Sequence, residues 1–473
     1  MEGGDLRSLM EAAVRQAQAA GAEFADVRTV SLDGTTVGVT DGVAKDLIAS
    51  HSYGAGVRVL HRGHWGYAPT SLVTRAGLEE ALRGALACAA AQTGPEQSQV
   101  ATPAHGQHGT ARQAATEVAV DPRGVSEQEK IERLLALERD ARTYSPLVKS
   151  TSASYADGVM QELVANSFGT FTDQTIIRTQ AGITVMARDG DNRQSARRAI
   201  AELAGYEIIR NADTATFGVE AAQVAVKQLG AARAPAGRFP VVMDPGITGL
   251  FAHEAVGHNS EGDGVAMHTS ILEGRLGDRV GSPAVTLIDD ATIPRSSGSY
   301  FFDSEGTPAA RRTIIDGGVL AGYLHSLESA AQLGARPNGS ARAFLHKNIP
   351  VVRMSNTFFA PGQATLDQLL DGIEYGLLCR GANWGYVFVE RGQFTCNVEE
   401  ATAIRHGQLA EPVSNVSIGG ITLDVLQGIE ACGAQFELKL TGGMCGKSGQ
   451  PMWVNAGGPY VRVREVVVGG YHQ

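Results

Sequence analysis

The pattern of the sequence changes near residues 234–237, and this change restricts the possible folds more than any other feature. Helix-like and strand-like segments alternate before it, whereas short strand-like segments broken by glycines follow it. The residues between them, Ala234-Pro235-Ala236-Gly237, are typical of a connection between folding units. A chain of 473 residues also exceeds what one hydrophobic core usually organises. We therefore predict an α+β fold, with a mixed α/β domain over residues 1–235 and a β-rich domain over residues 236–473.

Local patterns predict the elements of the first domain. Leu6, Leu9 and Val14 recur at helical spacing near the start of the chain. Ser126 followed by Glu129 is a capping-box pattern that indicates the start of a later helix. Residues 93–118 show little periodicity and are predicted to form a long loop. The other expected helices cover 74–91, 127–142 and 218–230, and the expected strands cover 26–40, 55–68 and 147–188, the last with a turn at 166–169.

The second domain is expected to consist mostly of strands. Valine and arginine alternate at residues 461–464, ahead of three valines and a Gly-Gly pair, which is typical of short strands broken by glycines. One conspicuous helix is expected near the start of this domain, after a strand at Phe239–Met243 and a Pro245-Gly246 turn.

Charge and composition exclude several functional classes. The formal net charge is -10 and there is no lysine or arginine stripe, so a nucleic-acid partner is not expected. No segment approaches the ~18 apolar residues of a membrane helix, and the first residues lack the pattern of a signal peptide. The five cysteines are odd in number and widely spaced, which argues against a disulfide framework. We expect a cytoplasmic protein without a membrane contact.

The segment His253-Glu254-Ala255-Val256-Gly257-His258 carries the residues best suited to chemistry. Neutral imidazole is a good zinc ligand, and a neighbouring glutamate can act as general base toward a metal-activated water. The same three residues could also be surface polar groups or a satisfied core cluster, because short motifs of this kind often match by chance.

The spacing of the two histidines is one residue longer than in the common His-Glu-x-x-His motif. On a regular α-helix, positions five residues apart point about 140° away from each other. Two such imidazoles would not face one metal ion. We therefore predict that the helix is irregular between His253 and His258, with a π-type bulge or an end at Gly257.

Six further segments accompany this motif in a fixed order. They are Gly54–Tyr67, Glu261–Asp263, Asp303–Pro308, Pro350–Thr357, Met444–Gln450 and Val468–Gly470. Together with His253–His258, they resemble the TldD/PmbA family of metallopeptidases over nearly the whole chain. The complete motif places the chain with the catalytic TldD type of that family. The segment Gln450–Ala456 departs from the family's usual Val- and Gly-rich continuation, which points to an altered substrate preference or a specialised paralogue.

The resemblance implies a site made of four residues. His253, His258 and Cys445 would be the zinc ligands, and Glu254 would be the catalytic base. Three protein ligands leave a fourth zinc position for water, as a catalytic site needs. The glycines around Cys445 would let the backbone bend closely around a ligand.

Other polar residues have weaker claims to a role in the site. Glu261 and Asp263 are expected either to orient a ligand ring or to form a solvated acidic turn. Arg353 and Asn356 could contact substrate or stabilise a sheet. The remaining histidines and cysteines considered are expected to be structural or exposed: His268, His325, His346, Cys88, Cys379, Cys396 and Cys432.

The expected activity is zinc-dependent hydrolysis of amide bonds in unfolded or extended peptides. One alternative is a zinc hydrolase or deacylase that acts on a small amide, and another is a regulatory partner subunit without catalysis. The resemblance also implies a dimer, either a homodimer or a heterodimer with a homologous subunit of the TldE/PmbA type. Neither the substrate nor the choice between these dimers follows from the sequence.

Overall fold

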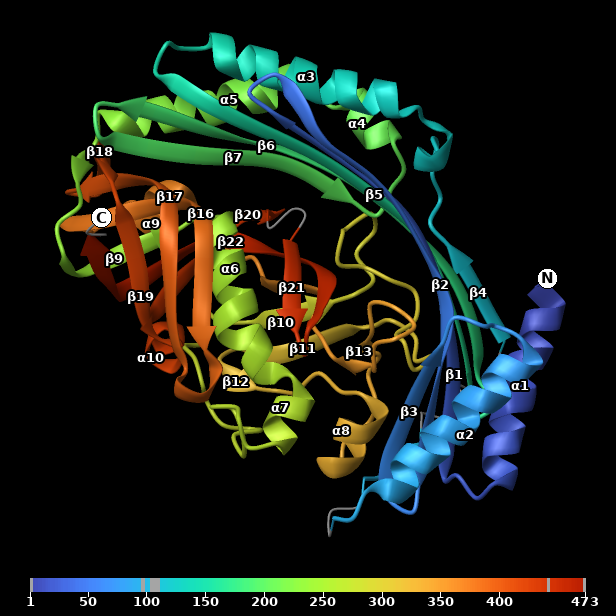
Figure 1. Cartoon of the computed structure of the whole chain (residues 1–473). Helices are drawn as coiled ribbons and strands as arrows, with labels where there is room; N and C mark the ends of the chain where they lie inside the picture. Colours follow the sequence, from blue (N-terminus) through green and yellow to red (C-terminus); the bar gives the residue numbers. More distant parts are fainter. Residues whose placement is uncertain (1–2, 95–97, 103–110, 440–442, 471–473) are drawn as a thin grey trace.

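A computed structural model describes residues 3–94, 98–102, 111–439 and 443–470. It has a mixed α+β fold, as predicted: a strongly curved N-terminal sheet with helices on its outer side, and a β-rich C-terminal half on its inner side (Figure 1). None of the described helices is long and apolar enough to cross a membrane. The division into domains at residue 235 remains our proposal.

The N-terminal sheet has the order β3-β2-β1-β5-β6-β4, with β7 paired to β6. All its pairs are antiparallel except that of β4 with β6. Asp41-Gly42 and Arg62-Gly63 make the first two turns, each with positive φ at both residues, which suits the twist of a tight hairpin. The strands are β1 (Phe24–Thr40), β2 (Val43–His61), β3 (His64–Thr70), β4 (Ala111–Ala115), β5 (Val148–Asn166), β6 (Phe171–Asp189) and β7 (Asn192–Glu202).

In the described part of the chain, four long helices pack on this sheet through alanine- and leucine-rich faces in two clusters. The N-cap Ser126 accepts a hydrogen bond from the backbone of Glu129, as the capping pattern predicts. The helices are α1 (Gly3–Ala19), α2 (Arg75–Ala91), α3 (Glu127–Thr143), the short α4 (Glu207–Asn211) and α5 (Thr214–Leu229). A 3-10 turn, η1, covers Pro122–Gly124.

Two sequence predictions for this half need correction. The strand expected over 55–68 is the end of β2 and most of β3, because the turn at Arg62-Gly63 interrupts it and β2 begins earlier, at Val43. The long loop expected over 93–118 contains β4, which is short and pairs with β6. Its periodicity is too brief to be seen in sequence, and residues 95–97 and 103–110 of that loop lie outside the described part.

The C-terminal half is built around one large sheet. Among the described strands, five form a closed ring in which each strand pairs with the next: β22, β9, β16, β17 and β19. The ring closes because β19 pairs with both β17 and β22. The strands are β8 (Ala232–Arg233), β9 (Gly237–Met243), β10 (Leu287–Asp290), β11 (Arg311–Asp316), β12 (Val319–Leu320), β13 (Ala341–Arg342), β14 (Val351–Val352), β15 (Asn356–Phe359), β16 (Tyr375–Phe388), β17 (Gln393–Arg405), β18 (Gln408–Ser414), β19 (Val416–Ile421), β20 (Ile429–Leu438), β21 (Gly443–Lys447) and β22 (Gln450–Gly470).

The conspicuous helix expected near the start of this half is α6 (Pro245–Phe251), which continues into a π-helical turn, η2 (Ala252–Gly257), and a 3-10 turn, η3 (His258–Ser260). Its apolar residues belong to the main C-terminal core, so the polar residues that it carries are fixed against β22, β16 and β15. The remaining short elements are α7 (Gly262–Ala266), α8 (Leu327–Gln332), α9 (Leu366–Leu370), η4 (Val389–Arg391) and α10 (Thr422–Gly428).

Candidate metal centre

The helix that carries the two histidines begins with a strong cap. Asp244 accepts a hydrogen bond from the backbone N–H of Ile247, and Pro245 occupies the first turn, where its missing N–H costs nothing. Gly249 allows the helix to lie directly on β22, because a Cβ atom there would be 2.5 Å from the backbone nitrogen of Gly457. The start and the packing of the helix therefore position the residues that follow.

The helix changes from α to π geometry at the histidine motif. The backbone N–H of His258 bonds to the carbonyl of His253, five residues earlier. In this geometry residues five apart lie on one side of the helix. The two imidazole centroids are 5.2 Å apart, with an angle of 75° between the rings. The predicted irregularity between His253 and His258 is thus confirmed, in its π form.

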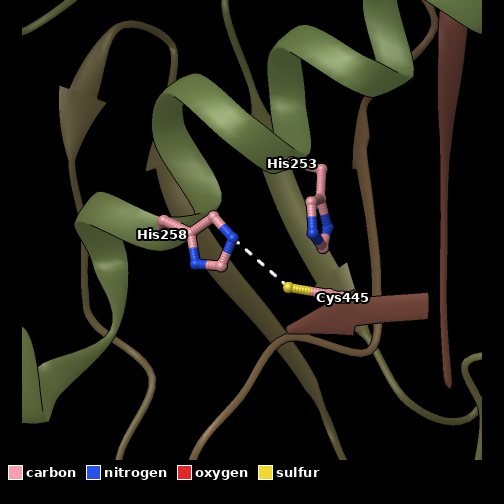
Figure 2. A group of neighbouring side chains, drawn as sticks. All are labelled: His253, His258 and Cys445. Carbon is pink, nitrogen blue, oxygen red and sulfur yellow. Dashed lines mark hydrogen bonds between the residues drawn. The ribbon is translucent and has the colours of Figure 1, made fainter. Parts of the chain in front are cut away.

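Cys445 reaches the histidines from β21, far away in the sequence. Its Sγ atom lies 3.3 Å from Nε2 of His258, and the three side chains point toward one another (Figure 2). One potential ligand atom from each of the three residues lies within 4.8 Å of the other two. Arg353 is fully buried and donates to the carbonyls of Cys445 and Gln450, which fixes this strand against the loop that precedes β15.

The electrostatics of the cluster favour a thiolate. Burial raises the pKa of the Cys445 thiol, but hydrogen bonds and charge interactions with the two histidines outweigh burial and lower it to about 4. Burial lowers the pKa of His258, yet the charge of Glu261 and the contact with Cys445 raise it well above its ordinary value. A deprotonated thiol is the form of cysteine that binds metals.

A buried ion-pair network supports the second histidine. Glu261 is 3% exposed, and its Oε2 atom lies 3.2 Å from Nδ1 of His258 and 3.0 Å from Nζ of Lys447. Lys447 also donates to both oxygens of Asp263, at 2.7 and 2.8 Å. Burial raises the pKa of Glu261, and the charges of His258 and Lys447 overcome this and lower it to about 2. Glu261 therefore contacts the ring directly, whereas Asp263 acts on Lys447.

Glu254 lies beside the cluster and reaches solvent. Its Oε2 atom is 3.9 Å from Nε2 of His258, and its side chain is 26% exposed. The other side chains considered in the sequence lie elsewhere. His268 is exposed and pairs with Glu273, and Asn356 is buried in hydrogen bonds to Ser296, Ser299 and Asp290. All five cysteines are free, and Cys379, Cys396 and Cys432 are buried away from the two histidines.

Sequence reasoning assigned no role to Lys447. Its position near the site could have been inferred, because Cys445 and Lys447 are two residues apart on a strand and their side chains therefore face the same side. No comparable signal linked Lys447 to Glu261 and Asp263, which are more than 180 residues earlier.

The donor set fits a tetrahedral metal ion. Two imidazole nitrogens and one thiolate are common zinc ligands, and such N and S ligands stand roughly 3.5 Å apart around zinc. The spacing of 3.3 Å between Cys445 and His258 agrees with this value. Nδ1 of His253 is buried without a hydrogen-bond partner, so the described protein atoms alone leave the polar groups of this cluster incompletely satisfied. The residues present therefore suit a metal centre.

Comparisons with known proteins identify the family of the chain. Sequence models of the PmbA/TldA metallopeptidase match in three parts: domain 1 at residues 25–89, the central domain at 120–229 and the C-terminal domain at 236–470. A metalloprotease of Methanothermobacter thermautotrophicus is 36% identical over 452 residues, which cover 95% of this chain and 96% of that protein. A zinc metalloprotease TldD homolog of Saccharolobus solfataricus is 28% identical, over 97% of this chain and 99% of that protein.

The fold also agrees with a solved structure. The crystal structure of TldE from Thermococcus kodakarensis superposes with a TM-score of 0.75 at 18% identity, covering 98% of this chain and 100% of that one. The resemblance noted in the sequence is thus confirmed over the full length, and the chain belongs to the PmbA/TldD metallopeptidase family.

Proposed function

We propose that His253, His258 and Cys445 hold one zinc ion and that Glu254 is the general base in the hydrolysis of amide bonds. The observation that carries this proposal is the convergence of three donor atoms within 4.8 Å, from a π-helical turn and a distant strand, beside a partly exposed glutamate. The name of the Saccharolobus relative supports zinc as the metal.

Each residue has a distinct part in this reaction. Zinc, when bound, would polarise the substrate carbonyl and acidify a water molecule. Glu254 would act as the general base that accepts a proton from the attacking water and as the general acid that returns it to the leaving nitrogen. Its partial exposure keeps the carboxylate accessible to substrate and solvent. Glu261 holds the ring of His258 through Nδ1 and thereby leaves Nε2 free to face the metal position.

The preferred substrate is proposed to be an extended peptide. Within the described residues, β21 pairs only with β22, so its other edge is unpaired right beside Cys445. An unpaired strand edge can bind an extended chain through main-chain hydrogen bonds, with little dependence on its side chains. We further propose that the protein works as a dimer, with itself or with a homologous TldE/PmbA-type subunit, and that the dimer excludes folded proteins from the site.

Two variants test the centre. Cys445→Ala should reduce bound zinc well below one ion per chain, as measured by elemental analysis. Glu254→Gln should keep the metal but lower kcat by about 10²–10⁴-fold, because the general base is lost. Full zinc occupancy of Cys445→Ala would refute the ligand assignment, and near-normal turnover by Glu254→Gln would refute the base.

The substrate proposal needs a matched pair of substrates. A folded domain and the same domain after denaturation should be offered to protein of known oligomeric state. We expect cleavage of the denatured form only. Equal cleavage of both, or full activity from a monomer, would exclude an enclosed site, and activity limited to small N-acyl compounds would favour the small-amide alternative.

A further inference from the structure

A cavity of about 470 Å³ separates the concave side of the N-terminal sheet from the C-terminal half. Figure 1 shows β21 on the side of the C-terminal half that faces this sheet. Most of the cavity wall is apolar, with contributions from Met160, Ile176, Phe302, Met444, Met452 and Trp453. Met444 precedes Cys445, so an occupant of the cavity would touch the strand that carries the proposed ligand.

Two buried guanidinium groups line this cavity. Arg178 of β6 and Arg342 of β13 are each 5% exposed. Arg178 donates from Nε and Nη2 to the carbonyls of Ser297 and Ser299. Arg342 donates from Nη1 to the carbonyls of Met354 and Trp453. Within the described part of the chain, these bonds leave Nη1 of Arg178 and both Nε and Nη2 of Arg342 unused.

Neither guanidinium has a carboxylate partner, although three acidic residues line the same cavity. Both oxygens of Glu162 are used, by Arg28 and Ser304 on one side and Gln174 on the other. Asp157 pairs with Lys130. Asp303 accepts backbone hydrogen bonds, and burial, reinforced by the charge of Glu305, raises its pKa well above the ordinary value. Among the described residues, therefore, no ion pair neutralises Arg178 or Arg342.

Two buried cations without a carboxylate partner are costly, even though the Cζ atom of Arg342 lies 4.7 Å from the centroid of the Tyr300 ring and gains a cation-π contact there. Burial lowers the pKa of Arg178 to about 9, and the positive charge of Arg342 adds to this effect. Burial lowers the pKa of Arg342 to about 10. Buried charges in proteins are normally paired, so two guanidinium groups without a carboxylate partner in one cavity point to a missing counter-charge. An anion between the two groups would satisfy the unused donors and remove their repulsion.

We propose that this cavity binds a carboxylate that carries an apolar body. Planar guanidinium forks match the two oxygens of a carboxylate, and the unused N–H groups of the two arginines supply such donors. The methionine, phenylalanine and tryptophan side chains around them suit an apolar body of modest size. Two sources share this chemistry: the C-terminus of a peptide substrate and a free organic acid.

The test uses 3-phenylpropionate and its amide, which have the same shape and contain no peptide bond. Calorimetry on the full-length, metal-loaded protein should show binding of the acid, with the amide weaker by at least about tenfold. Arg342→Gln and Arg178→Gln should each weaken the acid by a similar factor. Cys445→Ser should leave binding intact, which separates this cavity from coordination of the acid to the metal.

Three results would each overturn the proposal. They are equal affinity for the acid and the amide, unchanged binding of the acid in both arginine variants, and loss of acid binding in Cys445→Ser. If an arginine variant fails to fold, as judged by circular dichroism, the comparison of acid with amide and the result for Cys445→Ser decide the question. Because calorimetry measures binding and neither probe contains a peptide bond, the result does not depend on the proposed peptidase activity.

The source of the carboxylate can be identified by comparing the cleavage of one peptide in two forms, one with a free C-terminus and one with an amidated C-terminus. A peptide end in the cavity predicts that amidation raises KM at least tenfold, and that this difference disappears in Arg342→Gln. Equal kinetics for the two peptides, together with binding of 3-phenylpropionate, would assign the cavity to a free organic acid.

Discussion

Glu261 is the residue that connects the proposed metal centre to the surrounding protein. It contacts His258 on one side and Lys447 on the other, and it is almost fully buried. Groups that orient a metal-binding imidazole typically contribute a factor of about 10–100 to metal affinity. We therefore expect Glu261→Ala to weaken zinc binding by a factor of this size, measured by competition with a chromogenic chelator.

The matched control is Asp263→Asn, two residues along. Asp263 shares Lys447 with Glu261 but makes no contact with His258. The Asp263→Asn variant should therefore change zinc affinity much less than Glu261→Ala does. Equal losses in the two variants would mean that the ion-pair network acts as a whole and that Glu261 has no specific effect on the ring.

His325 gives the protein a pH-dependent stability, although it is not one of the proposed metal ligands. It is 5% exposed, and burial lowers its pKa to about 4 from an ordinary value of 6.5. Between these values the unfolded chain binds a proton that the folded chain does not, so stability falls as the pH drops through this window, by at most about 1.4 kcal/mol per pH unit. Urea unfolding of zinc-free protein should show a smaller fall for His325→Gln than for the unmodified chain. Identical slopes would contradict this assignment.

Functional residues could be predicted from the sequence where they lie close together in the chain. His253, Glu254 and His258 lie within six residues, and their spacing alone indicated an unusual helix. Arg178 and Arg342 gave no such signal, because each is an isolated arginine in a strand until the fold brings both to one cavity. Long-range contacts of this kind depend on register and sheet curvature, which local patterns do not encode.

At the scale of elements, the π turn is the feature on which the site depends. The extra residue between the histidines would splay them on an α-helix, and the π bond from His258 to the carbonyl of His253 absorbs it. Long elements with clear periodicity, such as α2 and α3, were predicted to within about one or two residues. The short β4 was missed, because five half-exposed residues carry too little pattern.

Close packing of α6 on β22 should be essential for the position of this turn. A Cβ atom at Gly249 would meet backbone atoms of Ala456 and Gly457 at 2.5–2.7 Å, and backbone cannot move aside as a side chain can. We expect Gly249→Ala to destabilise the protein by about 1–3 kcal/mol and to lower its zinc affinity. Thermal unfolding and metal titration would measure both effects.

Gly264→Ala in α7 is a suitable control for this variant. A Cβ atom there would lie 3.4 Å from the hydroxyl of Thr269, which is an ordinary contact. Alanine has a higher helix propensity than glycine, so this substitution should be neutral or stabilising. If Gly249→Ala behaved in the same way, the close approach of α6 to β22 would not determine the position of the histidines.

At the scale of the whole molecule, buried charges join the two halves. Arg58 of β2 bonds to Asp26 of β1 at 2.5 and 2.9 Å and to Glu305 of the C-terminal half at 2.9 Å. Arg58 and Glu305 belong to two of the segments that carried the family resemblance, which now have a common structural role. The sequence showed both segments, but only the folded chain shows that they meet.

Arg58 should therefore contribute more to stability than any surface charge. Its removal leaves two buried carboxylates without their shared cation, a change that typically costs about 3–5 kcal/mol. Arg58→Met keeps much of the side-chain length beside Trp65, so the loss would come mainly from charge. Arg405→Gln removes one partner of the exposed pair with Glu411 and should cost far less, because solvent screens this pair. Urea unfolding at pH 7 and pH 5 distinguishes lost charge from lost packing. Protonation removes the negative charge of the two carboxylates that have lost their cation. The decrease in the free energy of unfolding caused by Arg58→Met should therefore be smaller at pH 5. A loss of the same size at both pH values would assign the effect to packing against the aromatic rings.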